Sequence, residues 1–407
     1  MINFASRLPL YMACFLLVVF MSSCATKAPA RSASLSFDAA ITQVTDDLFA
    51  QTSQLPGFLS KIESKLKVGK IVIDPILDAT TGQQTEVGKV TEQLVVQRIA
   101  DKFPQFDVLR FNATELGNAQ YVLTGTLVRS REGAEQGQYR LALALTEFKT
   151  ELVVAQASVR ISDGNLDTNP TAFYRDSPAI AKDRIIEGYI RTTETQPGLP
   201  ADAIYLERLP TSSLIADANT AYSADHVVEA LALYEAAAKR PDGQQLRVLN
   251  GIYIAQWRLQ HLADAEKAFS AIVRLGLVTN NLSLKLLFKP GTTDFINDTK
   301  ISGPYTMWLR QIARQVVKSA HCVTVVGHTS RTGAENANDR LSLQRASVVR
   351  KSLQTEVPEL AARLRESGMG YRENIIGTGS DDARDALDRR VEFRVVECKQ
   401  VTSKGSV

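Results

Sequence analysis

The sequence contains few of the residues from which enzyme and metal sites are built. Its 407 residues include four cysteines and four histidines, scattered without the spacing of metal ligands. It has no Gly-x-Ser-x-Gly motif, no His-Glu-x-x-His motif and no phosphate-cradling loop. No apolar-flanked pair of carboxylates suits glycoside chemistry. We therefore expect a protein that is not an enzyme and that needs no cofactor or metal.

The sequence also has little net charge and, beyond its N-terminus, no long apolar run. The net charge is +3, and no stripe of basic and aromatic residues predicts a nucleic-acid partner. Beyond the N-terminus no segment is apolar enough to span a membrane. An apolar content of 44% suits two or three globular domains.

An apolar run near the N-terminus ends in small residues and a cysteine. Arg7 precedes the run at 8–21, and Ser-Ser-Cys follows it with the cysteine at position 24. The run is too short to cross a bilayer comfortably and has the order of a secretory signal. It resembles the bacterial lipoprotein signal, which implies a signal peptide at 1–23 and lipid attachment at Cys24. An ordinary secretory signal cleaved nearby is the alternative.

The residues after this cysteine bear on location. Residues 24–35 are rich in Ala, Ser, Pro and Lys and suit a flexible tether. By the same resemblance, Ala25 favours sorting to the outer membrane, with the chain facing the periplasm. More than one acyl chain would make that anchor stable.

Residues 36–161 alternate between helical and strand patterns and are predicted to form an α+β domain with a mixed sheet. Apolar residues recur at helical spacing in 37–66 and in 85–103, and Pro104 ends the second helix. Strand-like patterns lie at 70–74, 106–111, 119–129, 139–148 and 152–161. The last three of these are expected to form a meander.

Parts of this domain resemble a group of envelope lipoproteins. The matching segments are Ile73-Asp74-Pro75, NAQYVLTGT at 118–126, YRLALAL at 139–145 and TELVVA at 150–155. The group includes lipoprotein activators of penicillin-binding proteins, the curli secretion lipoprotein and flagellar FlgO-like proteins. An unrelated periplasmic α+β domain is the alternative. No residue of this domain stands out as a site.

The middle of the chain divides into a polar stretch and a helical one. Residues 162–210 are rich in Pro, Asp, Asn and Thr around one predicted helix at 180–192, which indicates a connector and a domain boundary. Residues 211–276 are helical. There Ala230 and Tyr234 recur as Ala265 and Phe269, an offset close to the about 34 residues of a tetratricopeptide repeat. Two such repeats are too few for a stable solenoid and are expected to pack on a neighbour.

The most informative stretch is VVGHTSRTGAENANDRLSLQRA at 325–346. A β-branched run at 323–326 predicts a buried strand, and a glycine-containing loop and a helix follow it. Such a junction directs backbone N–H groups at an anion. Gly327 and Gly333 permit a bend and a close approach, and Arg345 can hold a carboxylate with its planar guanidinium.

This stretch resembles the OmpA-like C-terminal domain, which binds peptidoglycan. The positions in register are Gly327, His328, Thr329, Gly333, Asn338, Leu341, Ser342, Arg345 and Ala346. Asp388-Arg389-Arg390-Val391-Glu392 matches the family's entry to its last strand, so the resemblance covers 282–398 and implies a βαβαββ fold. Residues 399–407 form a tail. The implied peptidoglycan-binding residues are Thr329, Ser330, Thr332, Gly333, Asn338, Leu341, Arg345 and Arg390.

One position departs from the family pattern. Ser330 stands where the family has the Asp that pairs with the free amino group of the stem-peptide diaminopimelate. By the resemblance, Arg345 still faces the stem-peptide carboxylate. Ser330→Asp is therefore expected to strengthen binding. Glu335 or Asp339 could supply a carboxylate instead, whereas Asp381, in a Gly/Asp-rich turn, is expected to be solvated.

Two cysteines remain in the mature chain, Cys322 and Cys398. They are predicted to form a disulfide, because an exported protein meets an oxidising compartment and both lie at strand ends. A metal site is the other interpretation, but two cysteines lack a ligand set.

Together these features predict a multidomain α+β outer-membrane lipoprotein that binds peptidoglycan and tethers the envelope layers. The alternative is a regulatory or assembly lipoprotein whose 36–276 region binds another envelope protein, such as a peptidoglycan synthase or part of a secretion or motility complex.

Overall fold

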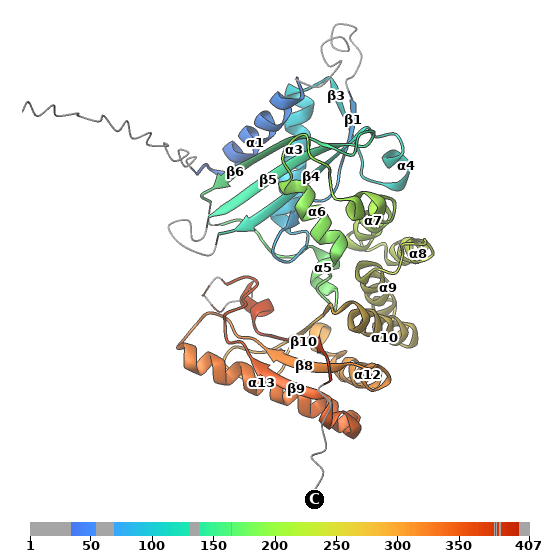
Figure 1. The fold of residues 1–407 in the computed structure, drawn as a ribbon, viewed down its shortest axis with the longest axis vertical. Coiled ribbons are helices and arrows are strands. Elements are labelled where there is room, and N and C mark those ends of the chain that lie inside the picture. The colour runs from blue at the N-terminus through green and yellow to red at the C-terminus, as the bar shows by residue number, and fades with distance from the viewer. Residues whose placement is uncertain are drawn as a thin grey trace, which may run out of the picture. The chain divides into compact units, whose positions relative to one another are not determined.

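A computed structural model describes residues 34–53, 69–130, 138–163, 165–377, 379, 381 and 384–398. The expected signal peptide, Cys24, nearly all of the tether and the tail at 399–407 lie outside these residues. No helix in the described ranges is both long and apolar enough to cross a membrane. The described residues form two β-sheets with their helices, joined by a run of helices (Figure 1).

The first sheet has the strand order β3-β1-β4-β5-β6, with β2 paired to β4. Strand β1 is parallel to both β3 and β4, whereas β4, β5 and β6 form an antiparallel meander. The sheet is therefore mixed, as predicted. Its strands are β1 (Gly69–Ile73), β2 (Leu77–Asp78), β3 (Phe106–Leu109), β4 (Tyr121–Arg129), β5 (Tyr139–Glu147) and β6 (Val153–Ile161).

Helices cover both faces of this sheet. Side chains alternate along a strand, so Ile71 and Ile73 of β1 pack under helices α1 (Phe37–Thr52) and α3 (Glu86–Lys102). Val72 faces the other way, into a cluster with side chains of α6 (Arg184–Glu194) and α7 (Ala203–Ser223). Thr85 begins α3 by accepting a hydrogen bond from the Gly88 N–H, the role expected of a helix cap.

The structure corrects the expectation that 162–210 is a connector. Besides α6, which corresponds to the helix predicted at 180–192, this segment forms α5 (Ala172–Asp176) and the start of α7, and it supplies the second layer on the sheet. Its acidic residues act as helix caps: Asp183 accepts from the first N–H groups of α6, and Asp202 does so for α7. Cap residues have the same composition as loops, which explains the error.

The helical section consists of α7 followed by α8 (Val227–Ala238), α9 (Leu246–Arg258) and α10 (Leu262–Thr279). It therefore begins at 203 rather than 211. Ala230 and Tyr234 of α8, and Ala265 and Phe269 of α10, are all buried. A Cβ at Gly251 would lie 2.3 Å from the Tyr234 ring, so α9 needs glycine where this ring packs against it.

The second sheet has the order β7-β10-β8-β9. Strand β10 runs antiparallel to β7 and β8, and β8 runs parallel to β9. The chain order is β-α-β-α-β-β, as expected. The elements are β7 (Leu282–Leu287), α11 (Thr299–Ser302), α12 (Tyr305–Lys318), β8 (Cys322–Gly327), α13 (Glu335–Glu356), η2 (Pro358–Ala362), β9 (Leu364–Gly368), η3 (Arg384–Asp388) and β10 (Arg390–Val396).

The helical section and the second sheet share one hydrophobic core. Trp308 of α12 stacks on Phe269 of α10 with the ring centroids 5.1 Å apart, and its indole N–H donates to the Tyr253 hydroxyl at 2.8 Å. The helices thus bury their apolar faces against a neighbouring part of the chain, as expected for a helical section this short.

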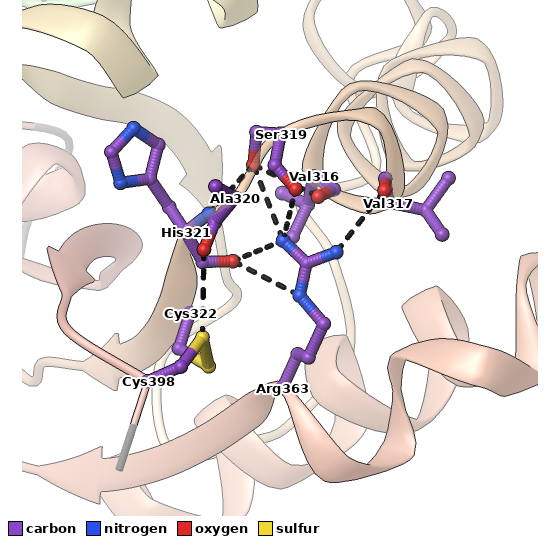
Figure 2. Close-up of a disulfide and its surroundings, with 8 residues drawn as sticks. All are labelled: Val316, Val317, Ser319, Ala320, His321, Cys322, Arg363 and Cys398. Atoms are coloured by element: carbon purple, nitrogen blue, oxygen red, sulfur yellow. Dashed lines mark hydrogen bonds between the residues drawn. A yellow bond between two sulfur atoms is a disulfide. The ribbon is translucent and has the colours of Figure 1, made fainter. Parts of the chain in front are cut away.

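A disulfide joins Cys322 to Cys398, with the Cα atoms 5.0 Å apart (Figure 2). Cys322 begins β8 and lies opposite Val396 at the end of β10, so antiparallel pairing brings the two cysteines together. The predicted disulfide is confirmed. Beside it, Arg363 donates hydrogen bonds to the carbonyls of Val317, Ser319 and His321 (Figure 2).

Candidate functional site

The candidate site lies where β8 meets α13, and glycines permit that junction. A Cβ on Gly327 would lie 1.9 Å from the Ser342 carbonyl oxygen, and one on Gly368 would lie 2.6 Å from Ser342 Oγ. Helix α13 therefore packs directly on the ends of β8 and β9. Gly333, at φ +85°, turns the loop into the helix with a backbone conformation that favours glycine.

Arg345 lies beneath this loop, fully buried. Its guanidinium donates to three carbonyl oxygens: Nε to Thr292 at 2.9 Å, Nη1 to His328 at 2.9 Å and Nη2 to Lys289 at 2.8 Å. It also lies 5.2 Å from the centroid of the Phe288 ring. Burial, with a smaller contribution from Arg389, lowers the pKa of Arg345 to about 10, so it stays charged at neutral pH.

These bonds fasten the segment after β7 to the end of β8. In this structure that segment covers Arg345, the residue expected to face a ligand carboxylate. A guanidinium has further N–H donors beyond these three, but a bidentate carboxylate would need the carbonyls of Lys289 or Thr292 to move aside. Arg345 is therefore both a candidate ligand group and a structural clamp.

A carboxylate does lie beside Ser330, and it comes from the turn before η3. The Ser330 hydroxyl donates to Asp381 Oδ1 at 2.6 Å. The same oxygen accepts from Arg389 Nη1, also at 2.6 Å. Ser330 and Arg389 are buried, whereas the Asp381 side chain is 24% exposed. Asp381 thus supplies a carboxylate at the position where the family Asp is missing.

The acidic residues considered from the sequence lie elsewhere. Asp339 pairs with Arg372 at 2.7 Å and Glu335 pairs with the same guanidinium at 3.4 Å. Neither contacts Ser330 through any bond within the described part of the chain. The expectation that Asp381 is simply solvated is corrected: it contacts Ser330 through a hydrogen bond that spans 51 positions of sequence. No local pattern reveals such a contact.

The other predicted residues fall around this centre. Asn338 is buried and donates to the Thr332 carbonyl at 2.8 Å, which holds the loop against α13. Thr329 is buried, Thr332 and Leu341 are half-buried, and Gly333 is exposed. The structure therefore places Thr332 and Gly333 at the surface of the site and the charged groups below them.

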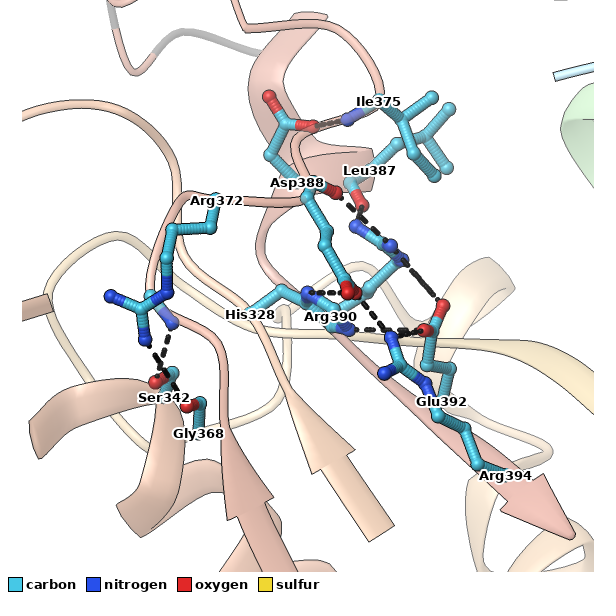
Figure 3. Close-up of polar contacts among 12 residues, drawn as sticks. His328, Ser342, Gly368, Arg372, Ile375, Leu387, Asp388, Arg390, Glu392 and Arg394 are labelled. Carbon is cyan, nitrogen blue, oxygen red and sulfur yellow. Dashed lines mark hydrogen bonds and ion pairs between the residues drawn. The ribbon is translucent and has the colours of Figure 1, made fainter. Parts of the chain in front are cut away.

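Arg390 belongs to a separate ionic network, drawn in Figure 3. Its guanidinium bonds Glu392 Oε2 at 3.1 Å and the Leu387 carbonyl at 3.4 Å. Asp388 accepts the N–H groups of Ile375 and Gly377 and so holds the loop that follows β9. Arg390 is only 4% exposed, so it supports the loop around the site.

His328 is the buried centre of that network. Its Nε2 lies 3.2 Å from Glu392 Oε1, and burial lowers the pKa of the imidazole. Ligand atoms of His328, Glu373 and Glu392 lie within 4.8 Å of one another, as a metal site would require. Arg394 pairs with both glutamates, and Arg390 also bonds Glu392. The carboxylates are therefore neutralised by guanidinium groups, which does not favour a metal.

The comparisons with known proteins match this part of the chain. Residues 287–387 match the family model described as OmpA family. The chain therefore contains an OmpA family domain with a βαβαββ fold. Outer membrane protein Omp38 of Acinetobacter baumannii is 29% identical over 112 residues, which are 27% of this chain and 30% of that protein. The match spans less than a third of this relative's length.

Similar solved structures cover the same share of the chain. The peptidoglycan-associated lipoprotein from Burkholderia pseudomallei is 20% identical, with 28% of this chain and 89% of that chain covered and a TM-score of 0.24. The C-terminal domain of Helicobacter pylori MotB is 22% identical, with 28% and 84% covered and a TM-score of 0.22. The cell wall anchor of the T6SS from Pseudomonas aeruginosa is 24% identical, with 28% and 78% covered and a TM-score of 0.22.

Proposed function

We propose that this chain is an outer-membrane lipoprotein that binds peptidoglycan non-covalently through residues 282–398 and tethers the envelope layers. The observation that carries the proposal is the OmpA family match at 287–387. Within it Ser330 contacts Asp381, which Arg389 holds from just beyond the match. Arg345 lies near enough to Asp381 and Arg389 to interact with both electrostatically. The Omp38 relative is itself an outer membrane protein, which supports an envelope location.

The charges at this point suit a zwitterionic stem peptide. Arg345 offers N–H donors for a carboxylate, and Asp381, held by Arg389, offers an acceptor for an ammonium group. Both kinds of bond are strong because they are charge-assisted and partly shielded from water. Asp381 thus takes the role of the absent family Asp, and Ser330 orients it through their 2.6 Å hydrogen bond.

Co-sedimentation of the full chain with purified sacculi tests this function. Untreated sacculi should retain the protein. Sacculi whose free stem-peptide amines have been acetylated, or whose carboxylates have been amidated, should retain at least tenfold less. Equal retention on all three would refute recognition of a zwitterion, and no retention on any of them would refute wall binding.

A pair of variants locates the site. Arg345→Gln should reduce retention, while Arg340→Gln, on the exposed side of the same helix, should not. Circular dichroism would separate loss of binding from loss of fold. If a folded Arg345→Gln protein still binds fully, the wall is held somewhere else on the chain.

The lipid anchor has its own test. Cys24→Ala should move the protein from the membrane to the soluble fraction, because the proposed attachment atom is its sulfur. Mass spectrometry of the wild-type mature N-terminus should show an acylated cysteine. An unmodified N-terminus would leave wall binding in place but exclude the tether.

A second candidate is a regulatory or assembly lipoprotein that grips another envelope protein through 36–276. Exposed apolar side chains at the starts of α8 and α10 favour it, with Val228 70% and Leu262 51% exposed. A pull-down with the full chain and with Val228→Asp/Leu262→Asp would distinguish the two, because only a protein partner should be lost in the variant.

A further inference from the structure

A cavity of about 330 Å³ lies outside the OmpA family domain, at the carboxyl ends of two parallel strands. Asp74 and Pro75 follow β1 directly, Arg110 and Phe111 follow β3, and all four line it. Side chains of α3, α5, α6, α7 and α9 also line it. Parallel strands joined through a helix bind ligands at this end, and the volume lies at the lower end of small-molecule sites.

Two carboxylates face this cavity. Asp74 Oδ2 accepts the Tyr205 hydroxyl at 2.8 Å. Glu92 Oε1 accepts the Ile76 N–H at 2.7 Å and the Gln84 amide at 2.9 Å. Over the residues that the structure describes, no hydrogen bond reaches the second oxygen of either carboxylate. Burial raises the pKa of Asp74 to about 6 and that of Glu92 to about 7, as expected for acids short of cationic partners.

A guanidinium of opposite charge lines the same cavity. Arg247 of α9 is 7% exposed, and its Nη2 donates to Ser212 Oγ at 3.1 Å and Gln245 Oε1 at 3.3 Å. Among the residues that the structure describes, its Nε is buried without a hydrogen-bond partner. Arg247 opposes the burial effect on the pKa of Asp74, but no ion pair joins the two among the described residues. A buried N–H left unpaired costs about 1–3 kcal/mol.

This arrangement is poorly suited to a purely structural role. Buried charges contribute less stability than packed apolar side chains of the same volume, and here they line a cavity. Lys89 and Arg110 also line the cavity, but they are paired with Glu86 and Asp217. The two carboxylates therefore disfavour a polyanion such as phosphate. In the described part of the chain, no third His, Cys, Asp or Glu converges with them into a metal site. The ligand class that complements the charges of this cavity is a molecule with one positive and one negative group.

We propose that this cavity binds a small zwitterion, a molecule of amino-acid size with an ammonium group and a carboxylate. The ammonium group bonds the free oxygens of Asp74 and Glu92, and the carboxylate bonds the Arg247 guanidinium. Aromatic walls from Tyr174, Tyr189 and Phe111 enclose the body of the molecule. The site is independent of wall binding, since none of its residues belongs to 282–398.

Isothermal titration calorimetry of the full-length protein tests the proposal. The probes are L-alanine, L-glutamate and L-lysine, with acetate and ethylammonium as single-charge analogues, and inorganic phosphate and calcium as competitors of other classes. At least one amino acid should bind ten times or more tightly than acetate and ethylammonium. Equal binding of acetate, preferred binding of phosphate or calcium, or no binding of any amino acid would overturn the proposal.

Variants assign the binding to this cavity. Arg247→Gln and Asp74→Asn should each weaken it at least tenfold, whereas Arg274→Gln and Asp101→Asn, at exposed positions, should not. Ala216→Phe keeps every charge but fills the cavity, and it should abolish binding even if the charge variants fold poorly. Full affinity in Ala216→Phe would place the bound molecule elsewhere. Co-sedimentation with sacculi should be unchanged in all five variants, which separates this site from the wall site.

Discussion

Exchanging Ser330 and Asp381 tests the most specific feature of the candidate wall site. Ser330→Asp alone restores the family residue, and the sequence by itself predicts tighter binding. The structure predicts the reverse, because Ser330 Oγ already lies 2.6 Å from Asp381 Oδ1. A second carboxylate there would meet the first at contact distance, and like charges in one site disfavour joint ionisation.

The magnitude follows from the geometry. Two unit charges about 4 Å apart near a protein surface repel by about 4 kcal/mol. Arg389 offsets part of this through its bond to Asp381, and the 24% exposure of the Asp381 side chain offsets more. We expect Ser330→Asp to destabilise the domain by about 1–3 kcal/mol and to weaken sacculus binding. Asp381→Ser removes a carboxylate from the buried Arg389 and should cost about 2–4 kcal/mol.

The double variant is the decisive protein. Ser330→Asp with Asp381→Ser leaves one carboxylate at the centre, now in the family position, so stability and binding should largely return. Urea unfolding followed by fluorescence, together with co-sedimentation, gives both quantities for the four proteins. Because the double variant should regain most of what each single variant loses, the coupling energy should approach the two single losses together, about 3–7 kcal/mol. Additive losses, or tighter binding by Ser330→Asp alone, would show that Asp381 does not occupy this site in the working protein.

Three further predictions concern stability. Removing the Cys322–Cys398 disulfide, which closes 76 positions of sequence, should lower the free energy of unfolding by about 4.5 kcal/mol in the loop-entropy model; free thiols in the oxidised, denatured protein would contradict it. Arg345→Lys should cost about 2–4 kcal/mol in urea unfolding, because one ammonium group cannot serve three separated carbonyls; an unchanged midpoint would refute the clamp. The pKa values of Asp74 and Glu92, about 6 and 7, lie above their ordinary values of 3.8 and 4.5, so the folded chain binds more protons and its stability should fall as pH rises from roughly 4 to 7. Asp74→Asn should flatten that slope, and an unaltered slope would refute the assignment.

What the sequence could predict was largely local. The junction of β8 and α13 depends on a glycine, a β-branched strand and a helix within one short segment, so its pattern was visible without a structure. The disulfide also could be predicted, because only Cys322 and Cys398 remained and the strands holding them were recognisable. The two helix pairs could be predicted because Ala230 and Tyr234 recur as Ala265 and Phe269.

What the sequence could not predict depends on contacts between distant segments. Asp202 looked like a loop residue because a cap and a loop use the same side chains, and only the structure shows that it begins α7. Asp381 reaches Ser330 from a turn that carries no periodic pattern. The cavity gathers Asp74, Glu92 and Arg247 from three elements, each of which alone looks unremarkable in an α+β domain or a helix.

The burial of Arg345 has a consequence for affinity. A ligand carboxylate must displace the carbonyls of Lys289 or Thr292 from Arg345. The apparent affinity is lowered by the small fraction of molecules in which these carbonyls have already moved aside. The bonds from Arg345 to these carbonyls already have a charged donor, so the gain on exchange comes only from making the acceptor charged as well. The difference supports only modest affinity for a single stem peptide. A chain held to the membrane at Cys24 would meet the wall at high effective concentration, and a weak, reversible site of this kind is then sufficient for a tether.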